Sequence, residues 1–430
     1  MKKYKYILFW FFITALTIPL LQYEFKIFPE QDLGGAYVKH KKIKLSKKTW
    51  LSGDYQQHYN DYYNDNLGFR PFFVKTYNQL NKLLFNKISS AGTIIGKNNT
   101  LFQTSYIRAI NGDDYVGKKI LQKKVKKLQT VQNWLKNKNI NLVLVIAPGK
   151  ASILKKFIPD KMLKKNPDTT NYNELITLLK NTNINYIDLK QYFLQIKDTC
   201  KYPLFPRCGT HWSGYGVTLA ADTMFKFIEK ITNTDLRDFY SEKGEITDKN
   251  LRFTDDDIGK ALNLIWNIKS DTLYYPNIVF DHSKKYKKLK VLSVGDSFNQ
   301  SFWEFYPYFS ELFDTSTRYW YYNRTVSWPK KYEGIPVKTL NFKKEIETKD
   351  LIIILTTEQN IYQFGFNFIE DLFFYENPAV YRTKQKIKYF KNKIITDNKW
   401  LQSVKEKAKK RNISVDSMIT IDAIWMVKNQ

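Results

Sequence analysis

The chain of 430 residues carries a formal net charge of +28, and 43% of its residues are hydrophobic and 16% aromatic. That apolar content is enough for one large domain or two of ordinary size, and it excludes a wholly disordered chain. The lysines are scattered through the whole sequence, so the charge indicates solvated surfaces more than one basic site for acidic polysaccharide, phospholipid headgroups or nucleic acid.

Residues 1–23 have the layout of a membrane anchor. A basic start precedes an uncharged run of 18 residues at 6–23, and one membrane crossing needs about 20 apolar residues. A cleaved signal peptide begins in the same way, but no clear small-residue cleavage site follows, so we favour a signal anchor over a cleaved signal or a buried core helix. The basic start favours a cytoplasmic N-terminus. We therefore expect an inner-membrane protein whose bulk faces the periplasm or extracytoplasmic side, with no nucleic acid partner.

Residues 24–90 predict a stalk and an N-terminal helical region, with an amphipathic helix at 71–86. From 91 onwards helices alternate with short apolar strands. We expect a hairpin at 91–104, helices at 114–138, 171–182 and 214–231, and strands at 140–147, 184–189, 288–298, 312–322 and 350–358. Such alternation predicts an α/β fold whose parallel sheet is flanked by helices on both faces. In these sheets, ligands bind at the carboxyl ends of the strands.

Two stretches depart from this alternation. Residues 232–287 are irregular, contain an acidic run at 254–257, and predict an insertion within a domain of residues 91–384. Residues 385–430 predict a C-terminal helical hairpin, in which Ser414 caps the second helix. The hairpin either packs on the core or forms a small interaction appendage.

Cys200 and Cys208 are the cysteines of the chain, and they flank seven residues of a proline-containing loop. In an exported chain, this closeness favours a disulfide. The alternative is a pair of unrelated buried thiols. A disulfide here would brace the loop that follows it.

Ser297 stands where a nucleophile is expected. It follows an apolar strand and a Gly-Asp pair, and a helix-like segment comes next. A nucleophilic serine needs a tight turn, with backbone N–H groups nearby for an oxyanion. The competing interpretation is an ordinary turn and helix cap.

His211 is the predicted general base for that serine. It lies in the glycine- and tryptophan-containing loop 209–216, which opens a helix, whereas the other histidines lie outside such a setting. Loops of this kind hold reactive groups on rigid scaffolds. A paired serine and histidine would form a nucleophile and its base.

The chain resembles the alginate O-acetyltransferase AlgJ/AlgX family, whose catalytic domain is like SGNH hydrolases. The resemblance covers most of 56–360, through NDNLGFRP at 64–71, IIGKNNTLF at 94–102, VIAPGKASI at 145–153, THWSGYG at 210–216, VGDSF at 294–298 and DLIIILTTEQN at 350–360. It implies a polysaccharide O-acetyltransferase acting outside the cytoplasm with a membrane acetyltransferase of the MBOAT type as acetyl supplier. It also implies that Ser297 is the nucleophile and His211 the base.

One position departs from the family, which carries Asp two residues before the histidine. This chain has Gly209 there. In serine proteases, the acid fixes the imidazole tautomer, and its loss lowers turnover about 10⁴-fold. Another carboxylate could take the place of this acid, and the candidates near His211 in sequence are Asp188, Asp198 and Asp222. If another carboxylate or a backbone carbonyl orients the ring, we expect Gly209→Asp to raise activity or leave it unchanged. If nothing orients the ring, we expect Gly209→Asp to restore orders of magnitude in rate.

Further polar residues at strand ends are substrate or oxyanion candidates: Lys150, Asp296, Glu358 and Tyr319. Lys150 could meet substrate anions or be a surface lysine. Glu358 could be catalytic or make a structural hydrogen bond, and Tyr319 could stack on sugars or be a buried aromatic. The sequence contains no metal-binding signature and no phosphate loop, so we expect no metal and no cofactor.

The resulting hypothesis is an O-acetyltransferase that moves acetyl groups onto a cell-envelope or exported polysaccharide through a serine acyl-enzyme. A polysaccharide deacetylase or esterase using the same site is the first alternative. A catalytically dead glycan-binding or assembly subunit is the second, because Gly209 replaces the usual Asp.

Overall fold

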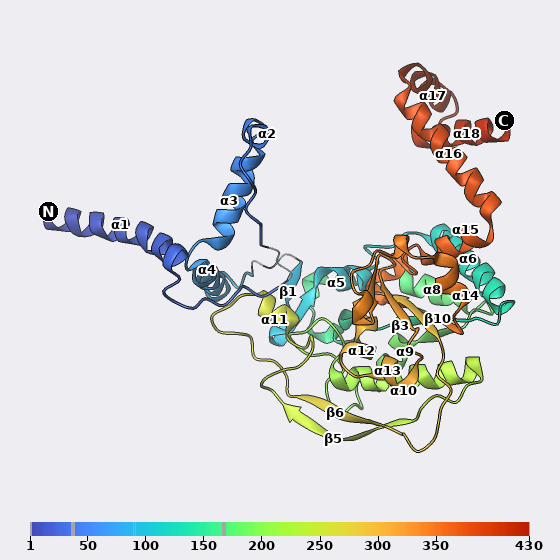
Figure 1. Cartoon of the computed structure of the whole chain (residues 1–430), viewed down its shortest axis with the longest axis horizontal. Coiled ribbons are helices and arrows are strands. Elements are labelled where there is room, and N and C mark those ends of the chain that lie inside the picture. The colour runs from blue at the N-terminus through green and yellow to red at the C-terminus, as the bar shows by residue number, and fades with distance from the viewer. Residues whose placement is uncertain (1, 36–38, 89, 91, 166–168, 430) are drawn as a thin grey trace.

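The computed structural model describes residues 2–35, 39–88, 90, 92–165 and 169–429. Figure 1 shows an α/β domain from which an N-terminal helical region and a C-terminal group of helices project. Residue 91, where we expect the hairpin and the domain to begin, lies outside the described residues, as do parts of the expected stalk at 36–38 and 89. The boundaries at 23, 90 and 384 remain predictions.

The main sheet has six strands in the order β4-β3-β10-β7-β8-β9. All neighbours pair parallel except β8 and β9, which pair antiparallel. The strands are β3 (Asn141–Ala147), β4 (Tyr186–Asp188), β7 (Val291–Gly295), β8 (Arg318–Tyr321), β9 (Thr325–Trp328) and β10 (Leu351–Thr357). The predicted parallel sheet is confirmed, and β9 is an addition at its edge.

Both faces of this sheet are buried, which explains the continuous apolar strands. Alternate residues of β3 enter two different hydrophobic clusters. Val143 and Val145 pack in the cluster that includes residues of α9 (Leu189–Ile196) and α10 (Gly214–Thr232). Leu142 and Leu144 pack in the other cluster with α6 and α8. Those two helices span Lys118–Lys136 and Asn171–Leu179.

Two antiparallel ribbons lie outside the main sheet. The expected hairpin is formed by β1 (Thr93–Ile95) and β2 (Leu101–Gln103), and α5 (Thr104–Asn111) follows it. The stretch 232–287 is more regular than predicted. It contains a ribbon of β5 (Phe239–Thr247) and β6 (Leu273–Phe280), with α11 (Asp257–Ala261) in the long connection between them.

The N-terminal region contains four helices in the described residues: α1 (Lys2–Phe25), α2 (Lys47–Leu51), α3 (Asp54–Asn66) and α4 (Arg70–Phe85). By length and composition, α1 is able to cross a membrane, and a signal sequence would have the same properties. Figure 1 shows α1 pointing away from the α/β domain.

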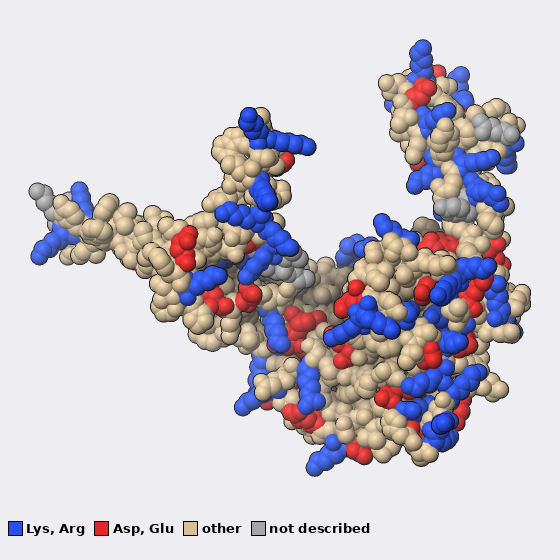
Figure 2. Space-filling view, in the orientation of Figure 1, with Lys and Arg blue, Asp and Glu red and all other residues tan. Residues whose placement is uncertain are grey.

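The C-terminal region follows α15 (Phe368–Glu376) and has a hydrophobic core of its own. The expected hairpin is present as α17 (Asn398–Lys410) and α18 (Val415–Lys428), with Ser414 capping α18. A further helix, α16 (Pro378–Thr396), contributes Phe390 and Ile394 to the same core. The hairpin therefore packs on α16 and stands away from the main sheet (Figure 1). Figure 2 shows Lys and Arg scattered over the visible face of the molecule.

Candidate active site

Ser297 lies at the carboxyl end of β7, in a turn that Asp296 holds in place. Asp296 Oδ2 accepts hydrogen bonds from Thr357 N at 2.8 Å, Thr357 Oγ1 at 2.7 Å and Asn360 Nδ2 at 2.9 Å. Its Oδ1 accepts from Phe298 N at 3.2 Å. Burial raises the pKa of Asp296, although these hydrogen bonds oppose the shift. The carboxyl group thus ties the nucleophile turn to the end of β10, and its oxygens are occupied by these contacts.

Tyr319 holds the same turn through a hydrogen bond from its hydroxyl. Its hydroxyl donates to the carbonyl oxygen of Asp296 at 2.7 Å, and its side chain is fully buried on β8. A ring in that position has no face available for a sugar. The sugar-stacking role considered for Tyr319 is therefore wrong, because burial and pairing of its hydroxyl give it a structural role.

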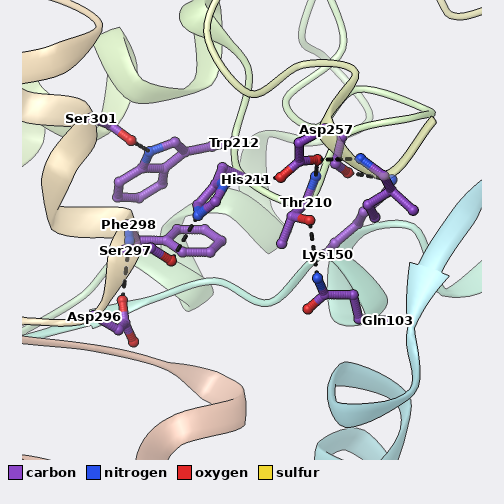
Figure 3. Close-up of polar contacts among 12 residues, drawn as sticks. Gln103, Lys150, Thr210, His211, Trp212, Asp257, Asp296, Ser297, Phe298 and Ser301 are labelled. Atoms are coloured by element: carbon purple, nitrogen blue, oxygen red, sulfur yellow. Dashed lines mark hydrogen bonds and ion pairs between the residues drawn. The ribbon is translucent and has the colours of Figure 1, made fainter. Parts of the chain in front are cut away.

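The structure brings His211 to Ser297. His211 Nε2 lies 2.8 Å from Ser297 Oγ, and Figure 3 shows the ring pointing at the serine. The neighbouring Trp212 is buried and donates from Nε1 to Ser301 Oγ at 2.8 Å. The imidazole also packs against the ring of Phe298, with 4.8 Å between ring centroids. The predicted contact between nucleophile and base is confirmed in geometry.

The carboxylate behind His211 is Asp257, at the start of α11. Its Oδ2 lies 3.7 Å from His211 Nδ1, beyond a normal hydrogen bond. Its Oδ1 accepts from Thr210 N at 2.8 Å and from Ile258 N at 2.7 Å (Figure 3). Within the described part of the chain, His211 Nδ1 has no hydrogen-bond partner. Asp257 is therefore positioned to interact with the imidazole, at a longer distance than a closed triad requires.

The three acids expected from sequence lie elsewhere. Asp188 accepts from the Tyr172 hydroxyl at 2.7 Å and caps α9, and Asp222 pairs with Lys226 along α10. Asp198 lines a surface cavity together with residues around 153–156 and 200–204. The expectation that one of them orients His211 is wrong, because these side chains lie away from the imidazole although they are near it in sequence.

Gly209 has no room for a side chain. A Cβ at this position would lie 2.6 Å from the Thr254 carbonyl oxygen, 2.8 Å from the Asp255 carbonyl oxygen and 2.6 Å from Pro206 Cγ. The backbone that leads to Asp257 thus occupies the space that an aspartate at 209 would need. A glycine at 209 therefore lets the segment before Asp257 pack against the histidine loop.

Lys150 is neither a substrate contact nor a surface lysine, so both sequence interpretations are wrong. It is 2% exposed, and its Nζ donates to the carbonyl oxygens of Arg207 at 2.8 Å and Gly209 at 2.7 Å. Burial lowers its pKa to about 7. Its role in the structure is to fix the loop that precedes His211.

Glu358 makes the structural contacts considered for it. It is buried at the end of β10, and its Oε1 forms an ion pair with Lys190 Nζ at 2.6 Å. Its other oxygen accepts from the Ser152 hydroxyl. These contacts join β10 to α9 and to α7 (Lys150–Ile153).

The predicted disulfide is absent, and Cys200 and Cys208 are both free thiols. Cys208 is buried in a small cluster with Leu101 and Ile258, whereas Cys200 packs against the large core of the α/β domain. Burial raises the pKa of Cys208 to about 11. The two side chains belong to different packing environments, which explains why they form no bond although they are close in sequence.

The site is arranged for base-assisted nucleophilic chemistry. Burial lowers the pKa of His211, and the charges of Asp257 and Asp296 oppose that shift. A lowered pKa keeps the imidazole neutral near pH 7, which is the form that accepts a proton from Ser297. Among the described residues, no three His, Cys, Asp or Glu side chains gather as a metal site would require.

Residues 93–316 match the family described as the SGNH hydrolase-like domain of acetyltransferase AlgX. The chain belongs to this AlgX-type acetyltransferase family. The match extends from β1 to the connection before β8, so it includes His211, Asp257 and Ser297. No curated protein matches the chain.

The solved structures to which the chain is similar include the following three. The O-acetyltransferase domain of Pseudomonas putida AlgJ is 19% identical and has a TM-score of 0.46, covering 66% of this chain and 98% of that one. Pseudomonas aeruginosa AlgX is 14% identical with a TM-score of 0.41, covering 65% and 67%. Bacillus cereus PatB1 is 12% identical with a TM-score of 0.37, covering 58% and 94%.

Sequence reasoning missed Asp257 although the signal was visible. The acidic run 254–257 stood out in the irregular stretch, and it lies more than 40 residues after His211. Nothing in the spacing indicated that the connection between β5 and β6 returns to the histidine loop. The resemblance implies an acid close to His211 in sequence, whereas Asp257 comes from a distant loop.

Proposed function

We propose that this member of the AlgX-type family transfers acetyl groups to hydroxyls of an exported or cell-envelope polysaccharide through an acetyl-Ser297 intermediate. The observation that carries the proposal is the 2.8 Å contact between His211 Nε2 and Ser297 Oγ at the carboxyl edge of a parallel sheet. Ligands of open α/β sheets bind at this edge.

The reaction would have two halves. His211 accepts the Ser297 proton as Oγ attacks the carbonyl carbon of an acetyl donor. The bond between that carbon and the rest of the donor then breaks, and the leaving group takes a proton from the imidazole. In the second half, His211 accepts the proton of a sugar hydroxyl, whose oxygen attacks the acetyl group. The new ester leaves and Ser297 regains its proton. Asp257 would stabilise the imidazolium that forms in each half.

The cellular setting is part of the proposal. The apolar helix α1 would anchor the chain in the inner membrane, with the α/β domain on the extracytoplasmic side. Acetyl groups would come from a membrane acetyltransferase of the MBOAT type, because acetyl donors of the cytoplasm do not reach that side unaided. The polysaccharide and its acetylated hydroxyl would be set by residues around Ser297.

The test is an acetyl-transfer assay with a soluble acetyl ester, with and without an oligosaccharide acceptor. The proposal predicts acetylated oligosaccharide from the full-length chain, and none from Ser297→Ala. Donor hydrolysis without transfer to any acceptor in a panel of envelope oligosaccharides would instead assign a deacetylase or esterase.

The second candidate, a glycan-binding subunit without turnover, is favoured by one observation. The 3.7 Å between Asp257 Oδ2 and His211 Nδ1 leaves that nitrogen without a hydrogen bond in the described structure. If this separation persists with ligand bound, the chain should bind oligosaccharide and show no acetyl turnover. Equal binding by the unaltered chain and Ser297→Ala, with no product from either, would assign this function.

A further inference from the structure

Helix α4 presents its apolar residues to the outside of the protein. Phe73, Tyr77, Leu80 and Leu84 recur at i, i+4, i+7 and i+11, so they form one stripe along the helix. Their side chains are 48%, 63%, 51% and 68% exposed, respectively. A stripe of this kind normally faces a core, whereas these four side chains stay exposed among the residues that the structure describes.

Two polar residues of α4 face the protein instead. Asn78 is 7% exposed and donates from Nδ2 to the Leu262 carbonyl oxygen at 3.0 Å. Gln79 is 4% exposed, and its Oε1 accepts from Trp266 N at 2.9 Å. The helix is therefore fixed with its hydrogen-bonding side toward the α/β domain and its apolar stripe turned away from it.

The start of α4 is packed against the last turns of α1. Gly68 lies so close to α1 that a Cβ there would be 2.3 Å from the Pro19 carbonyl oxygen and 2.6 Å from Gln22 Cβ. Pro19 and Gln22 lie near the end of the apolar run, where a span with a cytoplasmic N-terminus would leave the bilayer. In Figure 1, α1 lies across the view while α4 is seen nearly end-on, so α4 crosses the direction of α1. A helix that crosses the span at this level runs along the bilayer surface.

The composition of this surface fits lipid. Residues 71–88 include Lys75, Lys82 and Lys87, with no Asp or Glu, which complements anionic headgroups. Beside Gln79, Trp266 is 66% exposed. Aromatic rings of this kind are enriched where a protein meets the membrane interface.

We propose that α4 lies in the outer interface of the bilayer that α1 crosses, with its apolar stripe inserted at the boundary between headgroups and acyl chains. The inference rests on the anchor included in the proposed function, and it adds a second attachment. Together, α1 and α4 fix how the α/β domain is oriented on the membrane, which a single flexible anchor does not.

The test uses the full-length chain in nanodiscs of phosphatidylethanolamine and phosphatidylglycerol, with a spin label at one introduced cysteine. Leu84→Cys reports on the stripe and Phe11→Cys on α1. Ile246→Cys is the matched control, because Ile246 is 56% exposed on β5. The unsubstituted chain corrects for labelling of Cys200 and Cys208. Collision with oxygen, which concentrates in lipid, is compared with collision with a water-soluble nickel chelate.

The expected result is that oxygen collisions dominate at Phe11 and Leu84 and nickel collisions dominate at Ile246. Nickel-dominated collisions at Leu84, with oxygen dominating at Phe11, would overturn the proposal while leaving the anchor intact. Shielding of Leu84 from both reagents in native membranes, but not in nanodiscs, would assign the stripe to a protein partner and also overturn it. Nickel-dominated collisions at Phe11 would reject the anchor and this inference together.

Discussion

At the scale of single residues, the chemistry depends on how Asp257 divides its two oxygens. Oδ1 is held by the backbone N–H groups of Thr210 and Ile258, whereas Oδ2 faces His211 Nδ1 at 3.7 Å. The first contact fixes the carboxyl group on the histidine loop itself. The second places a negative charge beside Nδ1, the nitrogen that has to carry the ring proton so that Nε2 is free to accept the one from Ser297.

Asp257→Asn tests this arrangement. The amide oxygen can still accept from the two N–H groups, and the amide nitrogen then faces Nδ1 and favours a proton on Nε2, the wrong tautomer for accepting the Ser297 proton. We expect kcat to fall about 10²–10⁴-fold without loss of folding. The control is Asp222→Asn, at an exposed aspartate paired with Lys226. Equal kcat values for Asp257→Asn and the unaltered chain would remove Asp257 from the mechanism.

The pH profile gives a second measurement at the same residue. Because burial lowers the pKa of His211, the acid limb of kcat/KM should have its midpoint below the ordinary histidine value of about 6.5. Asp257 raises that pKa, so Asp257→Asn should move the midpoint further toward acid. A purely structural defect would lower the rate without moving the midpoint. A shift toward neutral pH would show that the sign of the interaction is wrong.

Gly209→Asp should lower activity, which reverses the expectation from sequence. A Cβ at 209 meets backbone oxygens of Thr254 and Asp255, so the loop carrying Asp257 has to move. Gly209→Ala is the matched control, because it adds the Cβ without a carboxylate. We expect both variants to lose acetyl transfer to a similar extent. Higher activity for Gly209→Asp than for the unaltered chain would contradict this account.

Catalytic candidates could be predicted from sequence where a short segment around the residue identifies it. Ser297 follows a strand and a Gly-Asp pair, and His211 stands in a distinctive loop, so each was found from its own surroundings. Asp257 could not be found in this way, because its role depends on a tertiary contact between the loops at 209–211 and 254–258. The failed disulfide has the same origin, since Cys200 and Cys208 point into different cores.

At the scale of elements, hydrophobic periodicity predicted the strands and helices that bury apolar side chains in the core. Strands β3, β7 and β10 and helices α6 and α10 each pack a strong pattern into the main core, so their positions were found within a few residues. The ribbon of β5 and β6 was missed because β5 is mostly exposed and neither strand alternates between buried and exposed residues. Helix α16 was not predicted, since few of its residues are buried.

The loop before His211 is fixed by α7 through Lys150. Lys150→Met keeps the buried chain and removes the two hydrogen bonds to the carbonyls of Arg207 and Gly209. Leaving buried carbonyl groups unpaired costs roughly 1–3 kcal/mol each, so denaturant unfolding should show a lower free energy of unfolding. Activity should also fall. Lys155→Met, at an exposed lysine next to α7, should change neither quantity. Unchanged stability and activity in Lys150→Met would show that Lys150 does not fix the loop.

At the scale of the whole molecule, the α/β domain carries the family match and the candidate site, while helices at both ends project from it (Figure 1). The N-terminal helices α1 and α4 would place the domain on a membrane. The C-terminal helices α16, α17 and α18 form a core of their own, so they are built as a separate unit. Such an arrangement would suit the function that we propose, in which the acetyl supplier lies in the membrane and the acceptor is a large polymer.

The acetyl-Ser297 intermediate is the central step of the proposed reaction, and intact-protein mass spectrometry can detect it. The full-length chain, mixed briefly with an acetyl ester and quenched in acid, should gain the mass of one acetyl group, and peptide mapping should place it on Ser297. Ser297→Ala should gain none, and an acceptor oligosaccharide should shorten the lifetime of the adduct. An acetyl group on another residue, or none under conditions in which acetylated oligosaccharide forms, would contradict the account.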